Sequence, residues 1–138
     1  MVGPDSEKEG AFRRMGELFK HGARIKTPLV GIILRRGYGL GAMAMMGGSF
    51  VDPIYSASWP NGEFGGMGLE GYVKLGFKKE LEAEETEEKK KALFDKLVAR
   101  MYEVGKATEA AAHLEMDAVI DPASTRETIL KAFKSFGA

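Results

Sequence analysis

The distribution of glycine limits the possible folds of this chain more than any other feature. Eleven of its 18 glycines lie between residues 37 and 76, where apolar segments give way twice to helical patterns. Glycine adopts positive φ angles at little cost and lets a ligand approach the bare backbone. Amide N–H groups at such a helix start can hold an anionic atom. The chain has no cysteine, two histidines and no obvious nucleophile, so we expect any chemistry to depend on backbone dipoles.

Charge and hydropathy argue against several classes of protein. Twenty basic residues balance 20 acidic ones, which argues against nucleic acid or an anionic membrane surface as the main partner. The longest apolar runs are far shorter than the roughly 18 residues of a membrane span. The first twenty residues lack the apolar core of a secretory signal, and the absence of cysteine is typical of a reducing compartment. We therefore expect one cytoplasmic domain over residues 1–138.

The N-terminal half predicts a helix followed by two strand-to-helix transitions. Ser6 and Glu9 form a capping-box pattern, which predicts a helix that ends at Gly22 in a C′ position. The apolar run Leu29–Leu34 shows no polar alternation, which is typical of a parallel strand covered on both faces. The expected segments are a helix over 6–21, a strand over 29–34, a turn over 37–41, a short methionine-rich helix over 42–48, a strand over 54–58, an extended piece over 63–66 and a helix from 67 or 68 to 77.

The C-terminal half predicts mainly helices. Residues 78–100 are helical and highly charged in pattern, and Gly105 is expected to end that stretch. A short alanine-rich helix over 108–114, a strand over 116–120 and a final helix that starts at Asp121-Pro122 and runs to Phe136 follow. Because strands alternate with helices throughout, we predict a layered α/β fold.

The segment Gly39-Leu-Gly-Ala-Met-Ala44 permits three interpretations. It matches the dinucleotide-binding pattern G-x-G-x-x-G/A, but four residues separate it from the preceding strand and its acidic partner would be Glu63, which follows a turn. It can also be a purely structural turn with close helix packing. In the third interpretation, the N–H groups of Leu40, Gly41 and Ala42 form an oxyanion hole.

Three segments carry a resemblance to a known family. Trp59-Pro-Asn-Gly-Glu-Phe-Gly-Gly-Met-Gly68 resembles the W-P-x-x-x-x-x-x-M-G segment of biotin-dependent acyl-CoA carboxyltransferases. Arg35-Arg-Gly-Tyr-Gly-Leu-Gly41 resembles their strand-turn segment with its Tyr-Gly pair. Asp117-Ala-Val-Ile-Asp-Pro-Ala-Ser-Thr-Arg126 is similar to the C-terminal D-x-V-I-x-P-x-x-T-R of the same family. The three segments occur in order, so the combined match is far more specific than any one of them.

The resemblance implies a crotonase-like fold with a mostly parallel sheet and flanking helices, and in particular the C-terminal half of a carboxyltransferase. In that family the N-terminal half holds the acyl-CoA and stabilises its enolate, and the C-terminal half holds carboxybiotin. Carboxyl transfer then needs no side-chain nucleophile, because a biotin nitrogen can itself take the substrate proton. At 138 residues, the chain is too short to include the acyl-CoA-binding half.

The same resemblance implies the site residues. Leu40 and Gly41 are expected to donate backbone N–H groups to the ureido oxygen of biotin. Some relatives carry an acid after the turn that influences which acyl group fits, and Met43 stands there in this chain. The residues expected to contact biotin or substrate are Tyr38, Gly39, Ala42, Met43, Gly68 and Gly71.

The resemblance also implies partners and cofactors. Biotin would arrive on a carrier protein, acyl-CoA would be the substrate, and the partners would be a second copy or the N-terminal half together with the biotin carboxyl carrier and biotin carboxylase subunits. No metal is expected, because His113 has no second ligand at a metal spacing. Two alternatives stay open: a non-catalytic assembly domain of the same fold, and a component of a CoA-thioester decarboxylase.

The remaining conspicuous residues have structural interpretations. Residues 78–91 are expected to be a solvated helix face, and Trp59 is expected to be a packing anchor. Among Met43, Met45 and Met46, helical spacing favours two as core residues.

Overall fold

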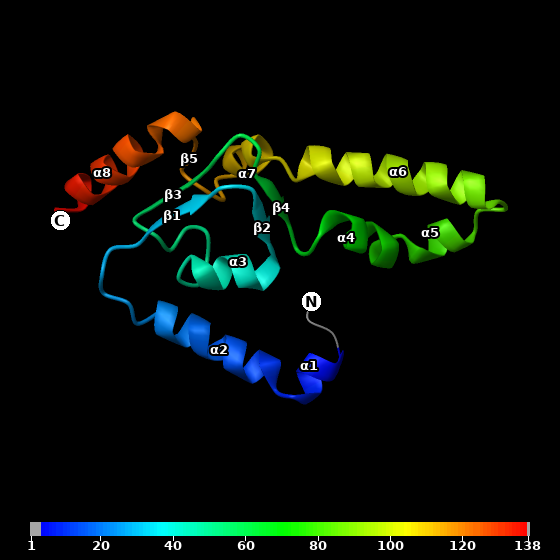
Figure 1. The fold of residues 1–138 in the computed structure, drawn as a ribbon, viewed down its shortest axis with the longest axis horizontal. Helices are drawn as coiled ribbons and strands as arrows, with labels where there is room; N and C mark the ends of the chain where they lie inside the picture. The colour runs from blue at the N-terminus through cyan, green and yellow to red at the C-terminus, as the bar shows by residue number, and fades with distance from the viewer. Residues whose placement is uncertain (1–3, 138) are drawn as a thin grey trace.

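A computed structural model describes residues 4–137 of the chain, as a layered α/β arrangement (Figure 1). Five strands form a three-stranded and a two-stranded sheet, and both sheets are parallel throughout. The strands are β1 (Val30–Ile33), β2 (Arg36–Tyr38), β3 (Tyr55–Ser58), β4 (Glu63–Gly65) and β5 (Ala118–Val119). The helices are α1 (Pro4–Lys8), α2 (Ala11–Gly22), α3 (Gly39–Met45), α4 (Leu69–Gly76), α5 (Lys78–Glu82), α6 (Glu87–Val104), α7 (Ala107–Ala112), the 3-10 helix η1 (Pro122–Ser124) and α8 (Thr125–Phe136).

The larger sheet has the order β1-β3-β5, so its middle strand is β3. Val30 pairs with Tyr55 and Ile33 with Ser58. This pairing confirms the parallel strand expected from the apolar run Leu29–Leu34 and the strand expected over 54–58. The polar residues of β3 are buried, and each has a partner. The Ser56 N–H donates to Asp117 Oδ2 at 2.7 Å, and the Ser58 hydroxyl donates to the Ile33 carbonyl at 3.2 Å. Buried polar groups in the sheet are thus satisfied, as a stable interior requires.

The smaller sheet, β2 with β4, differs from the prediction. Residues 37–41 were expected to form a turn, but Arg36–Tyr38 is a strand that pairs in parallel with Glu63–Gly65. Gly37 lies against the Phe64 ring, where an added Cβ would come within 3.1 Å of a ring carbon. The pairing joins segments 27 residues apart, so the local pattern could not reveal it.

The N-terminal helical region is interrupted, which corrects the expected single helix over 6–21. Gly10 has φ 78° and separates α1 from α2, so Ser6 lies inside α1 and forms no capping box. Gly22 belongs to α2 and has no positive φ angle, so the expected C′ role is also wrong. A side chain at Gly22 would overlap the Gly47 carbonyl, and close contact between α2 and the end of the α3 region is therefore the reason for glycine there.

The C-terminal half follows the prediction more closely. The charged stretch is divided into α5 and α6, and α6 ends at Gly105 as expected. Asp121 accepts from the Ala123 N–H at 2.7 Å and caps the turn that leads into α8. The alanine-rich helix ends two residues earlier than expected, because Leu114 has φ 59° and leaves the helix.

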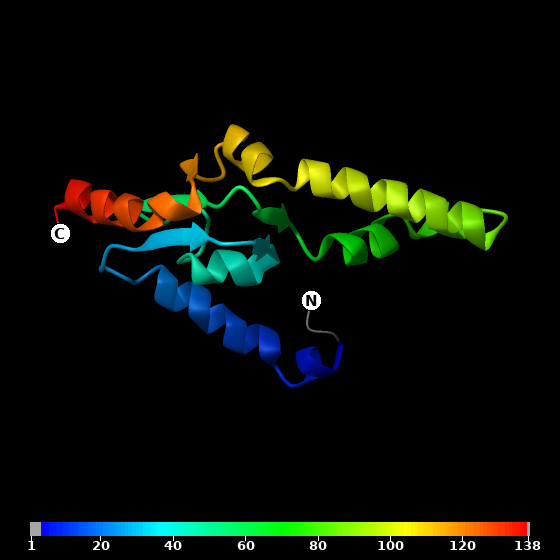
Figure 2. The ribbon, with the colours of Figure 1, turned by 45° about the horizontal axis from the view of Figure 1, so that its top comes forward.

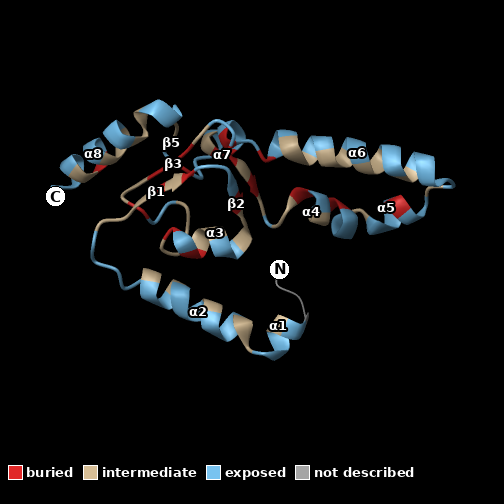
Figure 3. Cartoon of the chain, viewed as in Figure 1, coloured by how far each residue is buried: buried red, intermediate tan, exposed pale blue. Residues whose placement is uncertain are grey.

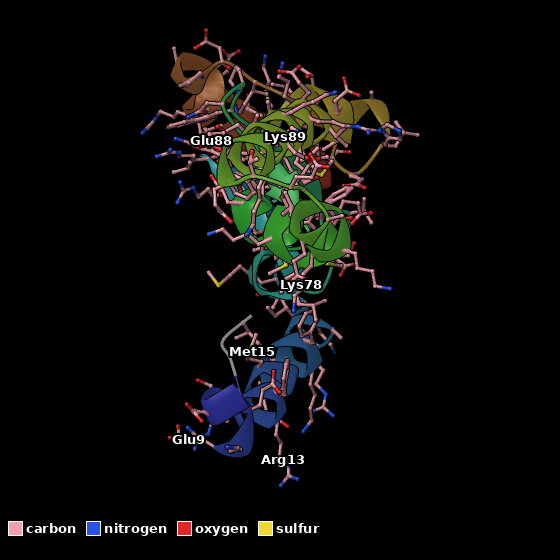
Figure 4. All side chains as sticks on the ribbon, turned by 90° about the vertical axis from the view of Figure 1, so that its right-hand side faces the viewer. Glu9, Arg13, Met15, Lys78, Glu88 and Lys89 are labelled. Atoms are coloured by element: carbon pink, nitrogen blue, oxygen red, sulfur yellow. The ribbon has the colours of Figure 1, made fainter. Side chains whose placement is uncertain are left out.

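Two helical segments extend from the sheets in different directions (Figure 2). The α1–α2 segment and the α4–α6 segment carry few buried residues, and neither α2 nor α6 contains one (Figure 3). Figure 4 shows Glu9 and Arg13 at the far end of the α1–α2 segment, directed away from the rest of the chain. It also labels Lys78, the first residue of α5, and Glu88 and Lys89 near the start of α6. The main core cluster lies between them and consists of Ile33, Met46, Phe64, Ala107, Ala110 and Met116.

Within residues 4–137, no helix combines the length and the apolar character that a membrane span needs.

Candidate functional site

The two glycine-rich junctions lie next to each other at one end of the smaller sheet. Tyr38, the last residue of β2, is in register with Gly65, the last residue of β4. The chain enters α3 directly after β2, and it enters α4 after the short connection 66–68 that follows β4. In α/β proteins, ligands bind outside the carboxyl ends of parallel strands. The structure thus brings two helix starts, each reached through glycine, to the edge where such a site forms.

Gly39 is required at the β2–α3 junction for two separate reasons. Its φ angle is +62°, a conformation that side chains other than glycine adopt rarely. A Cβ at this position would also lie 2.7 Å from the Gly66 carbonyl oxygen. The expectation that Gly39 permits the turn is therefore confirmed, and the contact with Gly66 joins the two junctions.

The backbone after Gly39 is open and has free donors. Among the described residues, no carbonyl or side chain accepts from the N–H groups of Leu40 or Gly41, which lie in the first turn of α3. The Leu40 side chain is 59% exposed, and an added Cβ at Gly41 would have no atom within 4 Å. First-turn N–H groups carry the positive end of the helix dipole. An oxygen with negative charge can therefore approach these N–H groups.

Tyr38 directs its side chain toward the strand pair. Its hydroxyl donates to Glu63 Oε2 at 2.7 Å, while Arg35 and Arg36 place Nε 3.6 and 3.5 Å from the oxygens of the same carboxylate. Burial, together with the hydrogen bond to Glu63, raises the pKa of the Tyr38 hydroxyl above its ordinary value. These contacts hold the two strand segments together. They also occupy Glu63, which argues against the ribose-binding role that a dinucleotide site would need.

The three methionines of the α3 region have different environments. Met46 is buried at 6% exposure, beside Gly31, while Met45 is 76% exposed. Met43 is half-buried and lines a cavity of about 490 Å³ next to the Gly39 turn. The expectation of two core methionines was wrong, since only Met46 is buried.

That cavity contains some predicted site residues and several that sequence reasoning missed. Gly39 and Met43 line it, whereas Gly68 and Gly71 do not, although both lie at the nearby start of α4. The missed residues come from the loop after α3 and from the end of α7, and no periodic signal marks either segment. They are Ser49, Phe50, Val51, Leu114 and Glu115, and the smaller sheet and its edge add Gly37, Phe64, Gly65 and Gly66.

Trp59 joins two of the segments that carry the family resemblance. Its Nε1–H donates to the hydroxyl of Thr125, the first residue of α8, at 3.0 Å. This contact agrees with its expected role as a packing anchor. His113 lies at the end of α7, with Nδ1 2.9 Å from the Glu109 carbonyl oxygen.

Comparison with known proteins identifies the family of this chain. Residues 1–136 match the family description "Carboxyl transferase domain". The methylmalonyl-CoA carboxyltransferase 12S subunit of Propionibacterium freudenreichii subsp. shermanii is 30% identical over 135 residues, which covers 92% of this chain and 25% of that protein. The biotin-dependent acetyl-/propionyl-coenzyme A carboxylase beta6 subunit of Mycobacterium tuberculosis is 30% identical over 133 residues, which covers 96% of this chain and 28% of that protein.

Two solved structures extend the comparison. A single-chain, multi-domain long-chain acyl-CoA carboxylase matches with a TM-score of 0.80 and 52% identity, over 96% of this chain and 13% of that one. The transcarboxylase 12S crystal structure matches with a TM-score of 0.84 and 26% identity, over 99% of this chain and 26% of that one. This chain thus spans about a quarter of the length of the curated relatives it matches. The chain has the crotonase-like α/β fold and belongs to the carboxyl transferase family.

Proposed function

We propose that this chain supplies the biotin-side half of a carboxyltransferase site, which transfers a carboxyl group from carboxybiotin to an acyl-CoA. The observation that carries the proposal is the pair of free N–H groups at Leu40 and Gly41, at the carboxyl end of parallel strands, in a chain of the carboxyl transferase family. Residues 1–138 would form one C-terminal domain of the complete enzyme.

The donors of this turn fit the ureido oxygen of biotin. A ureido oxygen is a neutral acceptor that gains negative charge when its ring nitrogen loses a substituent, so fixed N–H donors stabilise it as the reaction proceeds. Leu40 and Gly41 can donate without losing a hydrogen bond within the described residues. Carboxybiotin, brought by a carrier protein, supplies the carboxyl group, and Tyr38, Gly39 and Ala42 shape the turn that presents the donors.

The acyl-CoA is proposed to carry an apolar chain. The relative with 52% identity acts, by its description, on long-chain acyl-CoA. In this chain the half-buried Met43 lines the cavity beside the turn, where an acid would disfavour an apolar group. Gly68 and Gly71, at the start of α4, would contact the second substrate from the neighbouring junction.

The proposed partners follow from the share of its relatives that the chain spans, about a quarter. The acyl-CoA-binding N-terminal half, in the same chain or in another copy, would complete the site, and biotin carboxyl carrier and biotin carboxylase components would deliver carboxybiotin. A cytoplasmic location is part of the proposal, supported by the absence of cysteine.

Two substitutions at one position test the role of the backbone N–H. Gly41→Pro removes the donor, whereas Gly41→Ala keeps it and adds a Cβ with no atom of the chain within 4 Å. We expect biotin-dependent decarboxylation of malonyl-CoA by the complete enzyme to fall about 100-fold or more in Gly41→Pro, as for loss of an oxyanion donor. The alanine variant should keep most of the activity.

Circular dichroism of both variants checks that the fold is retained. Equal rates in the folded proline variant and the wild type would contradict the proposed role. Transfer that is absent from the wild type, although the protein associates with the N-terminal half, would favour the alternative of a non-catalytic assembly domain.

A further inference from the structure

Leu114 has an unusual conformation for a leucine. Its φ angle of 59° makes it the only residue other than glycine with a positive φ angle within residues 4–137. The Leu114 N–H donates to the Ala111 carbonyl and the Glu115 N–H to the Ala110 carbonyl, both at 3.0 Å. This pair of hydrogen bonds is a Schellman motif, in which the left-handed C′ residue is usually glycine.

The leucine side chain gains little from the rest of this chain. A side chain in the left-handed conformation is strained, and glycine would satisfy the same two hydrogen bonds without strain. Leu114 is nevertheless 82% exposed, so burial within the described residues does not offset the strain. Strained backbone conformations cluster at active sites and ligand sites, so Leu114 directs attention to its surroundings.

Leu114 borders the cavity next to the Gly39 turn. The cavity is about 490 Å³, within the usual range of roughly 300–1,000 Å³ for small-molecule sites. The lining includes the buried Phe64, whose exposed fraction is 6%. It also includes two exposed apolar residues, Leu114 and Val51, and the exposed fraction of Val51 is 64%. Most of the lining is apolar, and the exceptions are Ser49 and Glu115.

The same cavity is lined by residues on either side of the proposed donors in the chain. Gly39 and Met43 line it, and Leu40, Gly41 and Ala42 lie between them in the chain. Carboxyl transfer requires the reacting carbon of the acyl group to come close to the ureido group held by these donors. The remainder of an acyl chain that reacts there needs an apolar space beside the turn, and this cavity provides one.

We infer that the cavity holds the apolar chain of the acyl-CoA and that Leu114 is a specificity-determining residue which closes one side of it. This inference rests on the proposed function. An acyl chain against Leu114 and Val51 would remove both side chains from water, and this burial would offset the strain at Leu114. Because only a long acyl chain would reach the exposed Val51, contact with this residue would also favour long-chain acyl-CoA over short-chain acyl-CoA.

The substitution Leu114→Gly separates this role from a structural one. Glycine keeps the Schellman motif and relieves the strain, so the melting temperature of the complete enzyme should stay equal or rise. The value of kcat/KM for palmitoyl-CoA should fall about tenfold, because apolar contacts with several methylene groups are lost. The value for acetyl-CoA, which is too short to reach Leu114, should change less than about twofold.

Two further variants sharpen the comparison. Val51→Ser should change the ratio of palmitoyl-CoA to acetyl-CoA kcat/KM in the same direction. Leu130→Ser, a matched control at a 49% exposed leucine of α8, should leave that ratio unchanged. A loss of kcat/KM that is equal for both substrates in Leu114→Gly would overturn the inference. An unchanged ratio with weaker association of the N-terminal half would also overturn it and would show that protein covers Leu114.

Binding measured without turnover distinguishes this inference from the proposed function. Calorimetric titration of the complete enzyme with palmitoyl-CoA should show an affinity about tenfold weaker in Leu114→Gly than in the wild type. If the wild type transfers no carboxyl group to any acyl-CoA but the affinity difference is present, the acyl-chain site stands and the proposed function fails. Equal affinities would refute the acyl-chain site whatever the activity.

Discussion

Gly39 and Glu63 show how single residues prepare the β2–α3 turn. Gly39 supplies a positive φ angle and room for the Gly66 carbonyl, so the two junctions can touch. Glu63 accepts a hydrogen bond from Tyr38, the residue just before the turn, and pairs with Arg35 and Arg36. The pattern of glycines indicated the first of these features, whereas the second requires the pairing of β2 with β4 and could not be predicted locally.

The Tyr38–Glu63 contact predicts a dependence of stability on alkaline pH. Because the pKa of Tyr38 is raised in the folded state, its contribution is fully present below the unfolded pKa of about 10 and is lost as the pH rises toward the folded pKa. We expect the free energy of unfolding to fall above about pH 10, and to fall less steeply in Tyr38→Phe, which lacks the titrating hydroxyl. Urea unfolding between pH 8 and pH 11 measures both slopes.

Glu70→Gln is the matched control for that prediction. Glu70 accepts a hydrogen bond from Tyr102 at 2.7 Å, and that bond lowers the pKa of Glu70 and raises the pKa of Tyr102, but the bond lies at the surface, where solvent screens it. This variant should keep most of the slope of the wild type. A slope in Tyr38→Phe identical to that of the wild type would mean that Tyr38 does not titrate as the structure requires.

The sequence predicts some helices and strands of this chain better than others. The strands over 29–34 and 54–58 and the final helix were predicted because their hydrophobic patterns and caps are local. The division of the first helix at Gly10 was missed, since Ser6 and Glu9 imitate a cap inside α1. The cavity residues of the loop after α3 were missed because only tertiary packing brings them to the turn. The site was thus predictable where one turn defines it and not where distant segments complete it.

The hydrogen bond between Trp59 and Thr125 attaches α8 to the turn between β3 and β4. Thr125→Val removes the acceptor of the Trp59 Nε1–H while keeping a similar shape, so we expect a loss of about 1 kcal/mol in the free energy of unfolding. The chain contains one tryptophan, so its fluorescence reports directly on this contact. The exposed Thr108→Val serves as the control. Unchanged stability and emission in Thr125→Val would show that the hydrogen bond does not anchor α8.

At the scale of the whole molecule, the chain leaves many apolar side chains exposed. Phe12 of α2 and Phe136 of α8 are 53% and 57% exposed, and the helical segments extend away from a small core. Apolar surface that one chain leaves uncovered is typical of a protein interface. The share of the relatives that this chain spans, about a quarter, is consistent with a domain that packs against other parts of an enzyme.

We therefore expect the isolated chain to associate and to be inactive. Sedimentation velocity should show oligomers at micromolar concentration, because large apolar interfaces survive dilution. Carboxyl-transfer activity should require added N-terminal half, since the proposed function assigns the binding of the acyl-CoA to that half. A stable monomer would contradict the first expectation, and turnover by this chain alone would contradict the second.

The central claim is that the N–H groups of Leu40 and Gly41 hold the ureido oxygen, and infrared spectroscopy of bound biotin tests it most directly. With the ureido carbonyl labelled with 13C, the isotope difference spectrum isolates the stretch of that one bond in the complete enzyme. Donation from two fixed N–H groups polarises the carbonyl, so the account predicts a lower stretching frequency than in water for the wild type and Gly41→Ala, and a smaller shift for Gly41→Pro. A frequency equal to that in water, or the same shift in all three proteins, would contradict the claim.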